Sequence, residues 1–401
     1  MRIVIAPDKF KGSLSAPEVA AHLAAGLLAT EPGLTVEQIP VADGGEGTLD
    51  AAVGSGFELR SVTVAGPTGR PIIADFAVRG HQAVIEMAVA SGLAVLHKGE
   101  LSALTATSRG TGDLIRAALD AGCTDIVLGV GGSACTDGGA GLLSALGVKL
   151  LDERGQKLPD GGGALAQLAE VGVCGLDPRL AAANIVLASD VDNPLLGPNG
   201  AAEIFGPQKG ASPADVLALE HGLECYFRLL SNAIGTHAVT SSDAPGAGAA
   251  GGVGYAALAV LGAERRPGID VVLDFTGLDS RIAGADLVIT GEGSLDGQSL
   301  GGKTPMGVAQ AAARAGIPVI AVCGRTTLDP VTLSGAGFAK TYALTELEPD
   351  VSICIRDAAV LLERLGRRIA LDWAEGGSNT ADAGSTVPST PDFDTKEPFN
   401  V

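Results

Sequence analysis

The stretch ADLVITGEGSLDGQSLGGKTPMGVAQAAARAGIPVIAV, residues 285–322, carries the clearest fold signal in the chain. Its apolar runs predict strands over 287–290 and 319–322, and the periodic segment between them predicts a helix over 307–315. Short apolar strands that alternate with helices are typical of a parallel sheet covered on both faces. The stretch therefore predicts an α/β fold.

The same alternation opens the chain. Residues 2–6 predict a strand, and Ser15 and Glu18 form a capping box that begins an apolar-periodic helix. A second strand, expected over 36–42, ends at a cluster of glycine and acidic residues. The N-terminal segment thus predicts further strands and helices of a parallel sheet.

The pattern changes near residue 58. Glycine and proline turns there separate three short apolar runs, a spacing typical of an antiparallel meander. The expected strands are 59–64, 72–78 and 83–88. From 106 the alternation of helix and strand returns, whereas about 136–278 is loop-rich and mixed, with a hairpin-like segment expected over 148–157 and a helix near 213–234. A last amphipathic helix is expected near 352–374.

Composition narrows the classes of function. The 401 residues carry 27 Lys+Arg against 46 Asp+Glu, a formal net charge of −19. This acidic balance argues against nucleic acid or an anionic membrane as the main partner, because phosphate-rich surfaces attract basic ones. The six cysteines form no C-x-x-C pair, and the first residues have no signal-peptide pattern, so we expect a cytoplasmic protein.

Four clusters of glycine and acidic residues follow predicted strands, at residues 7–13, 43–48, 131–139 and 290–296. In open α/β sheets ligands bind beyond the carboxyl ends of strands, where glycines let the backbone approach phosphate. We expect nucleotide contacts at Gly131, Gly132, Ser133, Gly291 and Gly293. Carboxylates lie in or near these clusters, and Mg²⁺ uses one or two carboxylates plus phosphate oxygens. The predicted metal ligands are Asp43, Glu46, Glu292 and Asp296.

Residues 297–304, GQSLGGKT, match the pattern G-x-x-x-x-G-K-[ST] of phosphate-binding loops. Such a loop follows directly on its strand, yet here the predicted strand ends at Thr290, and residues 291–296 lie between it and the motif. We therefore favour a different scaffold in which Lys303 contacts a nucleotide phosphate.

A cluster of two acids and an amide, SDVDNP (189–194), follows another apolar strand. Asp190 in that position is suited to accept the proton of a substrate hydroxyl during phosphoryl transfer. An Asx turn ahead of Pro194 explains the cluster equally well. Both interpretations stay open at the level of sequence.

The chain resembles the bacterial type 1 glycerate kinases over about residues 1–372. Eight segments carry the resemblance: APDKFKGSLSA (6–16), PVADGGEGT (40–48), VIEMAVASGL (84–93), ATSRGTG (106–112), GVGGSACTDGGAGLLSALG (129–147), SDVDNPLLGPNGAAEIFGPQKGA (189–211), GAGAAGGVGYA (246–256) and ADLVITGEGSLDGQSLGGKTPMGVA (285–309). Lys9 and Cys135 depart from the family, which often has Ser and Asn there. The resemblance implies phosphorylation of D-glycerate by ATP and Mg²⁺, usually to 2-phosphoglycerate.

The resemblance also implies a Rossmann-like parallel-sheet domain and a second mixed α/β domain, with the active site in the cleft between them. Because the predicted pattern of strands and helices changes at these points, we assign 1–57, 105–135 and 280–374 to the first domain. The second domain then comprises 58–104 and 136–279. Residues 375–401, rich in Ser, Thr, Pro and Asp, are expected to form a disordered tail.

A glycerate site needs a cation, hydroxyl partners and a general base. We predict Asp190 and Lys11 as catalytic residues. The predicted substrate-binding residues are Lys9, Ser13, Ser108 and Thr111. The expected small-molecule partners are D-glycerate and ATP, and a homodimer is a compatible assembly. The alternatives are a P-loop NTPase or kinase for another small hydroxy acid, and a non-catalytic sugar-acid sensor on the same fold.

Overall fold

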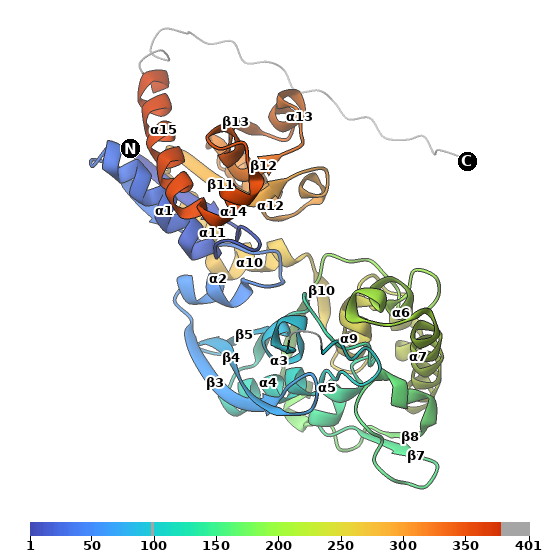
Figure 1. Cartoon of the computed structure of the whole chain (residues 1–401). Coiled ribbons are helices and arrows are strands. Elements are labelled where there is room, and N and C mark those ends of the chain that lie inside the picture. The colour runs from blue at the N-terminus through green and yellow to red at the C-terminus, as the bar shows by residue number, and fades with distance from the viewer. Residues whose placement is uncertain (98–99, 378–401) are drawn as a thin grey trace, which may run out of the picture.

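A computed structural model describes residues 1–97 and 100–377, which fold around two large sheets (Figure 1). The strands are β1 (Arg2–Pro7), β2 (Thr35–Gln38), β3 (Glu58–Ala65), β4 (Pro71–Arg79), β5 (Gln82–Glu86), β6 (Asp125–Gly129), β7 (Lys149–Asp152), β8 (Leu168–Gly172), β9 (Asn184–Ala188), β10 (Glu264–Arg266), β11 (Leu287–Leu295), β12 (Val319–Thr326) and β13 (Phe338–Ala343). The helices are α1 (Ala16–Thr30), α2 (Thr48–Gly54), α3 (Ala88–Ser91), α4 (Arg109–Asp120), α5 (Ala140–Ala145), α6 (Ala201–Phe205), α7 (Pro213–Ile234), α8 (Thr236–Ser242), α9 (Ala249–Ala259), α10 (Gly268–Thr276), α11 (Leu278–Ile282), α12 (Thr304–Arg314), α13 (Pro330–Gly335), α14 (Val351–Arg356) and α15 (Ala358–Gly377).

The first sheet has five strands in the order β13-β12-β11-β1-β2, and every neighbouring pair is parallel. β1 lies between β11 and β2, with Ile3 opposite Leu287. Both faces of β1 are covered, which explains why its residues form one continuous apolar run rather than an alternating one. The prediction of a parallel sheet is confirmed.

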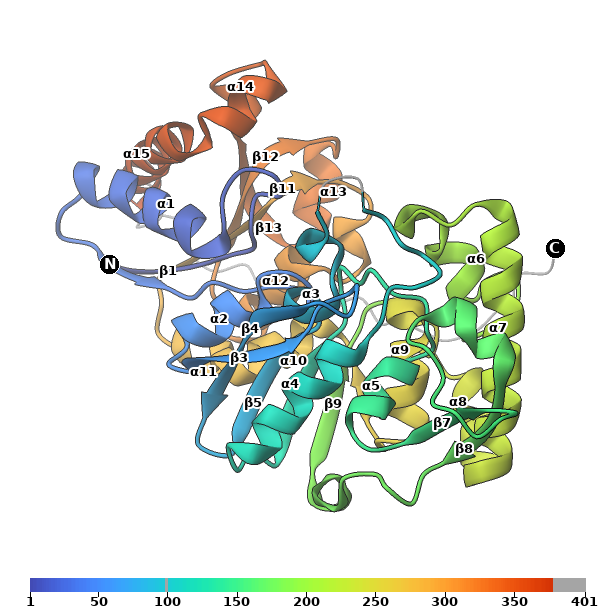
Figure 2. The ribbon, with the colours of Figure 1, turned by 60° about the horizontal axis from the view of Figure 1, so that its bottom comes forward.

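Helices α1 and α15 pack together on the outer face of this sheet (Figure 2). Gly26 makes their close approach feasible, because a Cβ at that position would overlap the backbone of Glu363. The capping box predicted at Ser15 and Glu18 is present at the start of α1. The contact brings the end of the chain's described part back to its beginning.

The second sheet has six strands in the order β10-β9-β6-β5-β4-β3. β3, β4 and β5 pair antiparallel, which confirms the predicted meander, while β5, β6, β9 and β10 are parallel. Helices α4, α5, α7 and α9 contribute to the core on one side of this sheet. The fold is therefore α/β, with one parallel and one mixed sheet.

Residues 105–135 depart from their predicted assignment. We expected them in the first domain, but β6 pairs with β5 on one side and with β9 on the other, in the second sheet. The physical reason is the parallel pairing of β5 with β6, which requires a crossover connection, and α4 supplies it. Strand and helix alternation alone does not specify which sheet a strand joins.

Two further local predictions differ from the structure. The helix expected near 352–374 is divided into α14 and α15 at Asp357. The hairpin expected within 148–157 is replaced by pairing of β7 with β8, and Leu151 makes only an isolated bridge to Lys157. The helix expected over 213–234 is confirmed as α7, which begins at a capping box of Ser212 and Asp215.

A shared core joins the two sheets. Helices α2 and α10 lie between them (Figure 1), and the buried cluster there includes Val4 of the first sheet and Val84 of the second. Packing at this junction directs the carboxyl ends of strands from both sheets toward one cleft. The loops after β1, β6 and β9 and the end of β11 meet there.

The predicted tail falls mostly on residues 378–401, outside the described residues. We expect a chain that ends at Gly377, the last residue of α15, to keep its thermal midpoint and kcat nearly unchanged. The reason is composition: the removed segment has little apolar surface with which to offset its ordering entropy. Calorimetry and a steady-state assay of the truncated and full chains test this, and a large drop in either quantity would contradict it.

Candidate active site

Two connected cavities occupy the cleft. The first has a volume of about 590 Å³ and the second about 420 Å³. They share the wall residues Lys11, Asp43, Gly45, Gly131 and Gly132. A third hollow of about 370 Å³ adjoins them, since it shares Lys303 with the first cavity and Asp190 with the second.

The cavities bring together most of the predicted site. The predicted residues that line the first cavity are Lys9, Lys11, Ser13, Asp43, Glu46, Gly131, Gly132, Glu292, Gly293, Asp296 and Lys303. Ser133 and Asp190 line the second cavity. These residues come from loops far apart in the sequence, as expected where strand ends of two sheets converge.

Lys9 lies among carboxylates at the end of β1. Its ammonium donates to the backbone oxygen of Glu46 at 2.7 Å and lies 3.7 Å from Asp8 Oδ1. Burial lowers the pKa of Lys9, but the nearby carboxylates, chiefly Asp8 and Asp43, outweigh burial and raise it overall. Lys9 therefore stays charged and compensates the acidic wall.

Asp8 was not assigned to the site from sequence, although it directly follows β1. Burial, reinforced by the charge of Asp43, raises its pKa to about 6 against the opposing influence of Lys9. The Thr304 hydroxyl donates to Asp8 Oδ2 at 2.9 Å. That bond ties the first turn of α12 to the end of β1, so Asp8 is held in a fixed position on the cavity wall.

Glu292 lies on β11 and faces the first cavity. Burial raises its pKa to about 7, helped by the charges of Asp8 and Asp296. Its Oε1 atom is buried and has no hydrogen-bond partner. A buried carboxylate oxygen without a partner is costly unless a ligand satisfies it.

The carboxylates of this cavity fit Mg²⁺ held jointly with phosphate. Among residues 1–97 and 100–377, no three His, Cys, Asp or Glu side chains are grouped closely enough to hold a metal by themselves. Mg²⁺ commonly binds one or two carboxylates and completes its coordination with substrate phosphates and water. The unpartnered Oε1 of Glu292 and the neighbouring Asp8 are suited to that role.

The raised pKa of Glu292 makes a stability prediction with a definite sign. Its folded pKa, about 7, exceeds the ordinary value of 4.5, so the unfolded chain binds fewer protons between these pH values. The free energy of unfolding from this group therefore falls as pH rises through that interval. We expect Glu292→Gln, compared in EDTA with the parent, to be relatively more stable at pH 8 than at pH 5.

Thermal midpoints at the two pH values measure this difference. Glu58→Gln, on an exposed edge of β3, is the matched control and should show no such trend. A Glu292→Gln protein that loses stability more at pH 8 than at pH 5 would contradict the interpretation.

The motif of residues 297–304 follows its strand more closely than expected. β11 runs to Leu295, so the predicted end of the strand at Thr290 is wrong. The pairing of β11 with β12 continues to Leu295 and Thr326, which explains the extension through a glycine-rich stretch. α12 begins at Thr304, and Lys303 caps it and lines the first cavity. The arrangement is strand, glycine turn and helix, which suits phosphate.

Gly291 does not line the cleft. A Cβ there would overlap the backbone of Val322 on β12, so this glycine is required for strand packing. Gly293 does line the first cavity, two residues further along β11. The prediction of a nucleotide contact at Gly291 is therefore not supported by its position.

Asp190 lies on the wall of the second cavity, just after β9. Its Oδ1 accepts a hydrogen bond from the backbone N–H of Gly268 at 2.8 Å, a contact across 78 residues. Burial, assisted by the charge of Asp43, raises the pKa of Asp190. The observed bond anchors the carboxylate to α10, whereas an Asx turn would have engaged a neighbouring backbone group.

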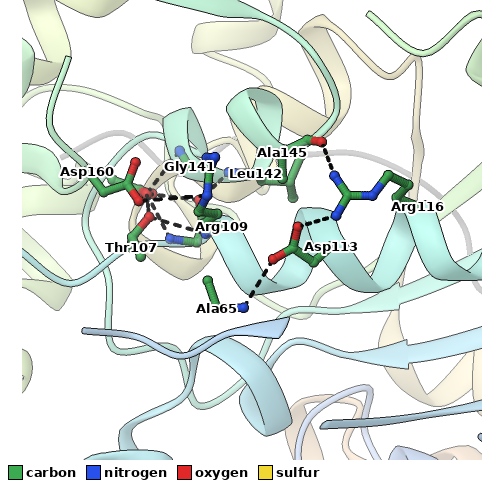
Figure 3. Close-up of polar contacts among 11 residues, drawn as sticks. Ala65, Thr107, Arg109, Asp113, Arg116, Gly141, Leu142, Ala145 and Asp160 are labelled. Carbon is green, nitrogen blue, oxygen red and sulfur yellow. Dashed lines mark hydrogen bonds and ion pairs between the residues drawn. The ribbon is translucent and has the colours of Figure 1, made fainter. Parts of the chain in front are cut away.

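Ser108 and Thr111 lie outside both cavities, contrary to the prediction that they bind substrate. Both are fully buried around the start of α4, a region shown in Figure 3. The Ser108 hydroxyl donates to Asp137 Oδ2 at 2.9 Å, and the Thr111 hydroxyl donates to Ser91 at 3.0 Å. These hydroxyls hold the core together and are not presented to the cleft. Ser13 does line the first cavity, but its hydroxyl donates to the backbone of Ile355.

The model of the Glycerate kinase family matches residues 3–374. The chain belongs to the glycerate kinase family. It is therefore an enzyme of the kinase class. Among residues 1–97 and 100–377, no helix combines the length and apolarity needed to cross a membrane.

Several glycerate kinase relatives are similar along nearly their whole length. The chain is 44% identical to the Glycerate kinase of Bacillus subtilis (strain 168), covering 92% of this chain and 97% of that one. It is 44% identical to the Glycerate 2-kinase of Escherichia coli (strain K12), covering 94% and 100%. The crystal structure of putative glycerate kinase 2 from Salmonella typhimurium LT2 superposes with a TM-score of 0.82 at 41% identity, covering 94% and 99%.

Sequence reasoning missed two further buried charged residues of this glycerate kinase family member. Glu86 ends β5, and burial raises its pKa to about 7 near Lys9. An acid closing an apolar strand is a signal that could have found it. Lys209 is almost fully buried yet lines the second cavity. Its loop has no periodicity or spacing that marks it, so only the three-dimensional structure reveals it.

Proposed function

We propose that the protein transfers the γ-phosphoryl group of ATP to D-glycerate in the presence of Mg²⁺, with 2-phosphoglycerate as product. Membership of the glycerate kinase family supports the reaction class, and a relative named Glycerate 2-kinase supports the choice of hydroxyl. The structural observation that carries the proposal is the pair of cavities that meet at Lys11 and Asp43. One suits a nucleotide, and the other suits a small hydroxy acid.

The first cavity has an apolar end and a polar end. Leu344, Val351, Cys354 and Ile355 form the apolar end, where Val351 is 38% and Ile355 48% exposed. Exposed aliphatic side chains on a cavity wall are suited to cover the flat face of a nucleobase. Glycine backbone at Gly293 and the ammonium of Lys303 occupy the polar end, where they are suited to the phosphates.

Mg²⁺ fits between the carboxylates and the phosphates. Glu292 and Asp8 would hold the ion, with Asp43 and Asp296 on the same wall. When bound, Mg²⁺ neutralises the charge that develops on the transferred group. In its absence these carboxylates repel one another and the phosphates. Burial is the main cause of the raised pKa values of Asp8 and Glu292, and the charges of neighbouring carboxylates add to it.

The acceptor hydroxyl is oriented from the second cavity. Its oxygen forms a bond to the γ-phosphorus while the bond from that phosphorus to the ADP oxygen breaks, and its proton passes to Asp190. The bond from Gly268 holds Asp190 in place, and the raised pKa makes its carboxylate a better proton acceptor. Lys11 borders both cavities and is placed to contact the group in transfer.

A coupled assay of ADP formation tests the proposal against the alternatives. We expect ADP release from Mg²⁺·ATP to depend on added D-glycerate. ADP release without glycerate would favour a P-loop NTPase, which the strand–turn–helix geometry around Lys303 makes the strongest competitor. Glycerate binding without turnover would favour a sugar-acid sensor. The homodimer and the cytoplasmic location considered from the sequence stay predictions.

A further inference from the structure

Lys209 lines the cleft but has no role in the reaction scheme above. It ends a short 3₁₀ turn, Pro207–Lys209, and the following Gly210 has φ of 92°, which turns the chain sharply. The side chain extends into the protein and donates to the backbone oxygen of Cys135. Only 1% of Lys209 is exposed. Burial of a lysine to this degree is rare unless its charge is compensated.

The compensation within the protein is incomplete. An ammonium group has three N–H donors, and the bond to Cys135 uses one of them. Burial lowers the pKa of Lys209, and the charge of Asp137 opposes this only in part. The oxygens of Asp137 already accept from Ser108, Gly139 and Gly141. No ion pair within 4.0 Å joins Lys209 to a carboxylate among residues 1–97 and 100–377.

The location of Lys209 indicates what would complete its pairing. It lines the second cavity together with Asp190, Ser133 and Lys11. Lys11 also lines the first cavity, where phosphate charge is expected. Lys209 is thus the cation that, among the described wall residues, belongs to the second cavity and not to the first. A carboxylate entering that cavity would supply the missing counter-charge.

We propose that Lys209 is a specificity-determining residue that binds the carboxylate of the acceptor. The inference rests on the proposed function and adds how the acid is distinguished from a neutral polyol. An acceptor with a carboxylate pairs with the buried ammonium at one end of the cavity, and its hydroxyl reaches Asp190 at the wall. A neutral alcohol leaves the buried ammonium unpaired, and sites of this kind reject such analogues strongly.

Lys209→Gln tests the assignment, because glutamine keeps a donor for the Cys135 oxygen but removes the charge. We expect kcat/KM for D-glycerate to fall by about 10²-fold or more, with the change mainly in the KM for glycerate. The KM for ATP should stay close to the parent value. Lys209→Arg, which restores the charge, should recover part of the loss. Circular dichroism melting confirms that each variant is folded.

A Lys209→Gln enzyme with an unchanged KM for glycerate, or with equal losses for both substrates, would show that Lys209 serves only to hold the Cys135 loop. A crystal structure of the unaltered protein with D-glycerate is a second measurement that needs no variant. We expect a carboxylate oxygen within hydrogen-bond distance of Lys209 Nζ, and a carboxylate placed on Lys9 or Lys11 instead would overturn the assignment. If the unaltered enzyme does not phosphorylate glycerate at all, it is the proposed function that fails first.

Discussion

Removing divalent cations is expected to abolish phosphoryl transfer, while glycerate still binds. The first cavity places Asp8, Asp43, Glu292 and Asp296 around the expected phosphates, and only Lys9, Lys11, Lys303 and Arg325 provide positive charge on its described wall. Without a metal ion, the carboxylates repel the nucleotide and leave Glu292 Oε1 without a partner. The charge that develops during transfer would then go unneutralised.

Assays in excess EDTA, followed by titration with Mg²⁺, measure the effect. We expect activity to disappear and to return with added Mg²⁺, and we expect Glu292→Gln to need a higher Mg²⁺ concentration for half-maximal rate. Calorimetric binding of D-glycerate in EDTA is the control, because Glu292 does not line the second cavity. Full turnover in EDTA would contradict the assignment of the first cavity as a metal–nucleotide site.

Replacement of Asp190 by Asn is expected to lower kcat by about 10²-fold or more, with little change in the KM for glycerate. Asparagine keeps the shape of the side chain and can still accept the bond from Gly268 through its carbonyl oxygen. It cannot take the proton of the acceptor hydroxyl. The loss should therefore appear in the chemical step and not in binding.

Asp192→Asn is the matched control. Asp192 lies two residues away, is largely exposed and pairs with Arg265 at 2.7 Å on the surface. Exposed ion pairs contribute little to stability, so this variant should stay close to the parent in kcat. If Asp190→Asn retains near-native kcat, the carboxylate of Asp190 is structural, and the base must be sought at Asp43.

Much of the fold followed from the sequence, because hydrophobic periodicity is a local property. The parallel strands around 285–322, the meander after residue 58 and helix α7 each depend on patterns within a short window. The sheet to which β6 belongs does not. Its position depends on pairing with β9, which lies more than fifty residues further along the chain. Non-local pairing of this kind leaves no periodic signal in the strand itself.

The residues of the candidate site were predictable only in part. Acids and glycines at strand ends, such as Asp43, Asp190 and Gly293, did reach the cleft, because the carboxyl ends of strands meet there. Ser108 and Gly291 did not. Ser108 makes a buried hydrogen bond, and Gly291 allows two strands to pack closely. A sequence motif cannot distinguish either role from contact with a ligand. Lys209 was missed because its function depends on burial, which its own loop does not reveal.

The most direct test of the central claim is ³¹P NMR of the products formed from ATP, Mg²⁺ and D-glycerate. Our account predicts ADP together with a phosphomonoester whose phosphorus is split into a doublet by the single proton on C2 of glycerate. A triplet would place the phosphoryl group on the 3-hydroxyl and contradict the predicted product. A spectrum with inorganic phosphate as the only new monophosphate, or with ATP unchanged, would contradict phosphoryl transfer to glycerate itself.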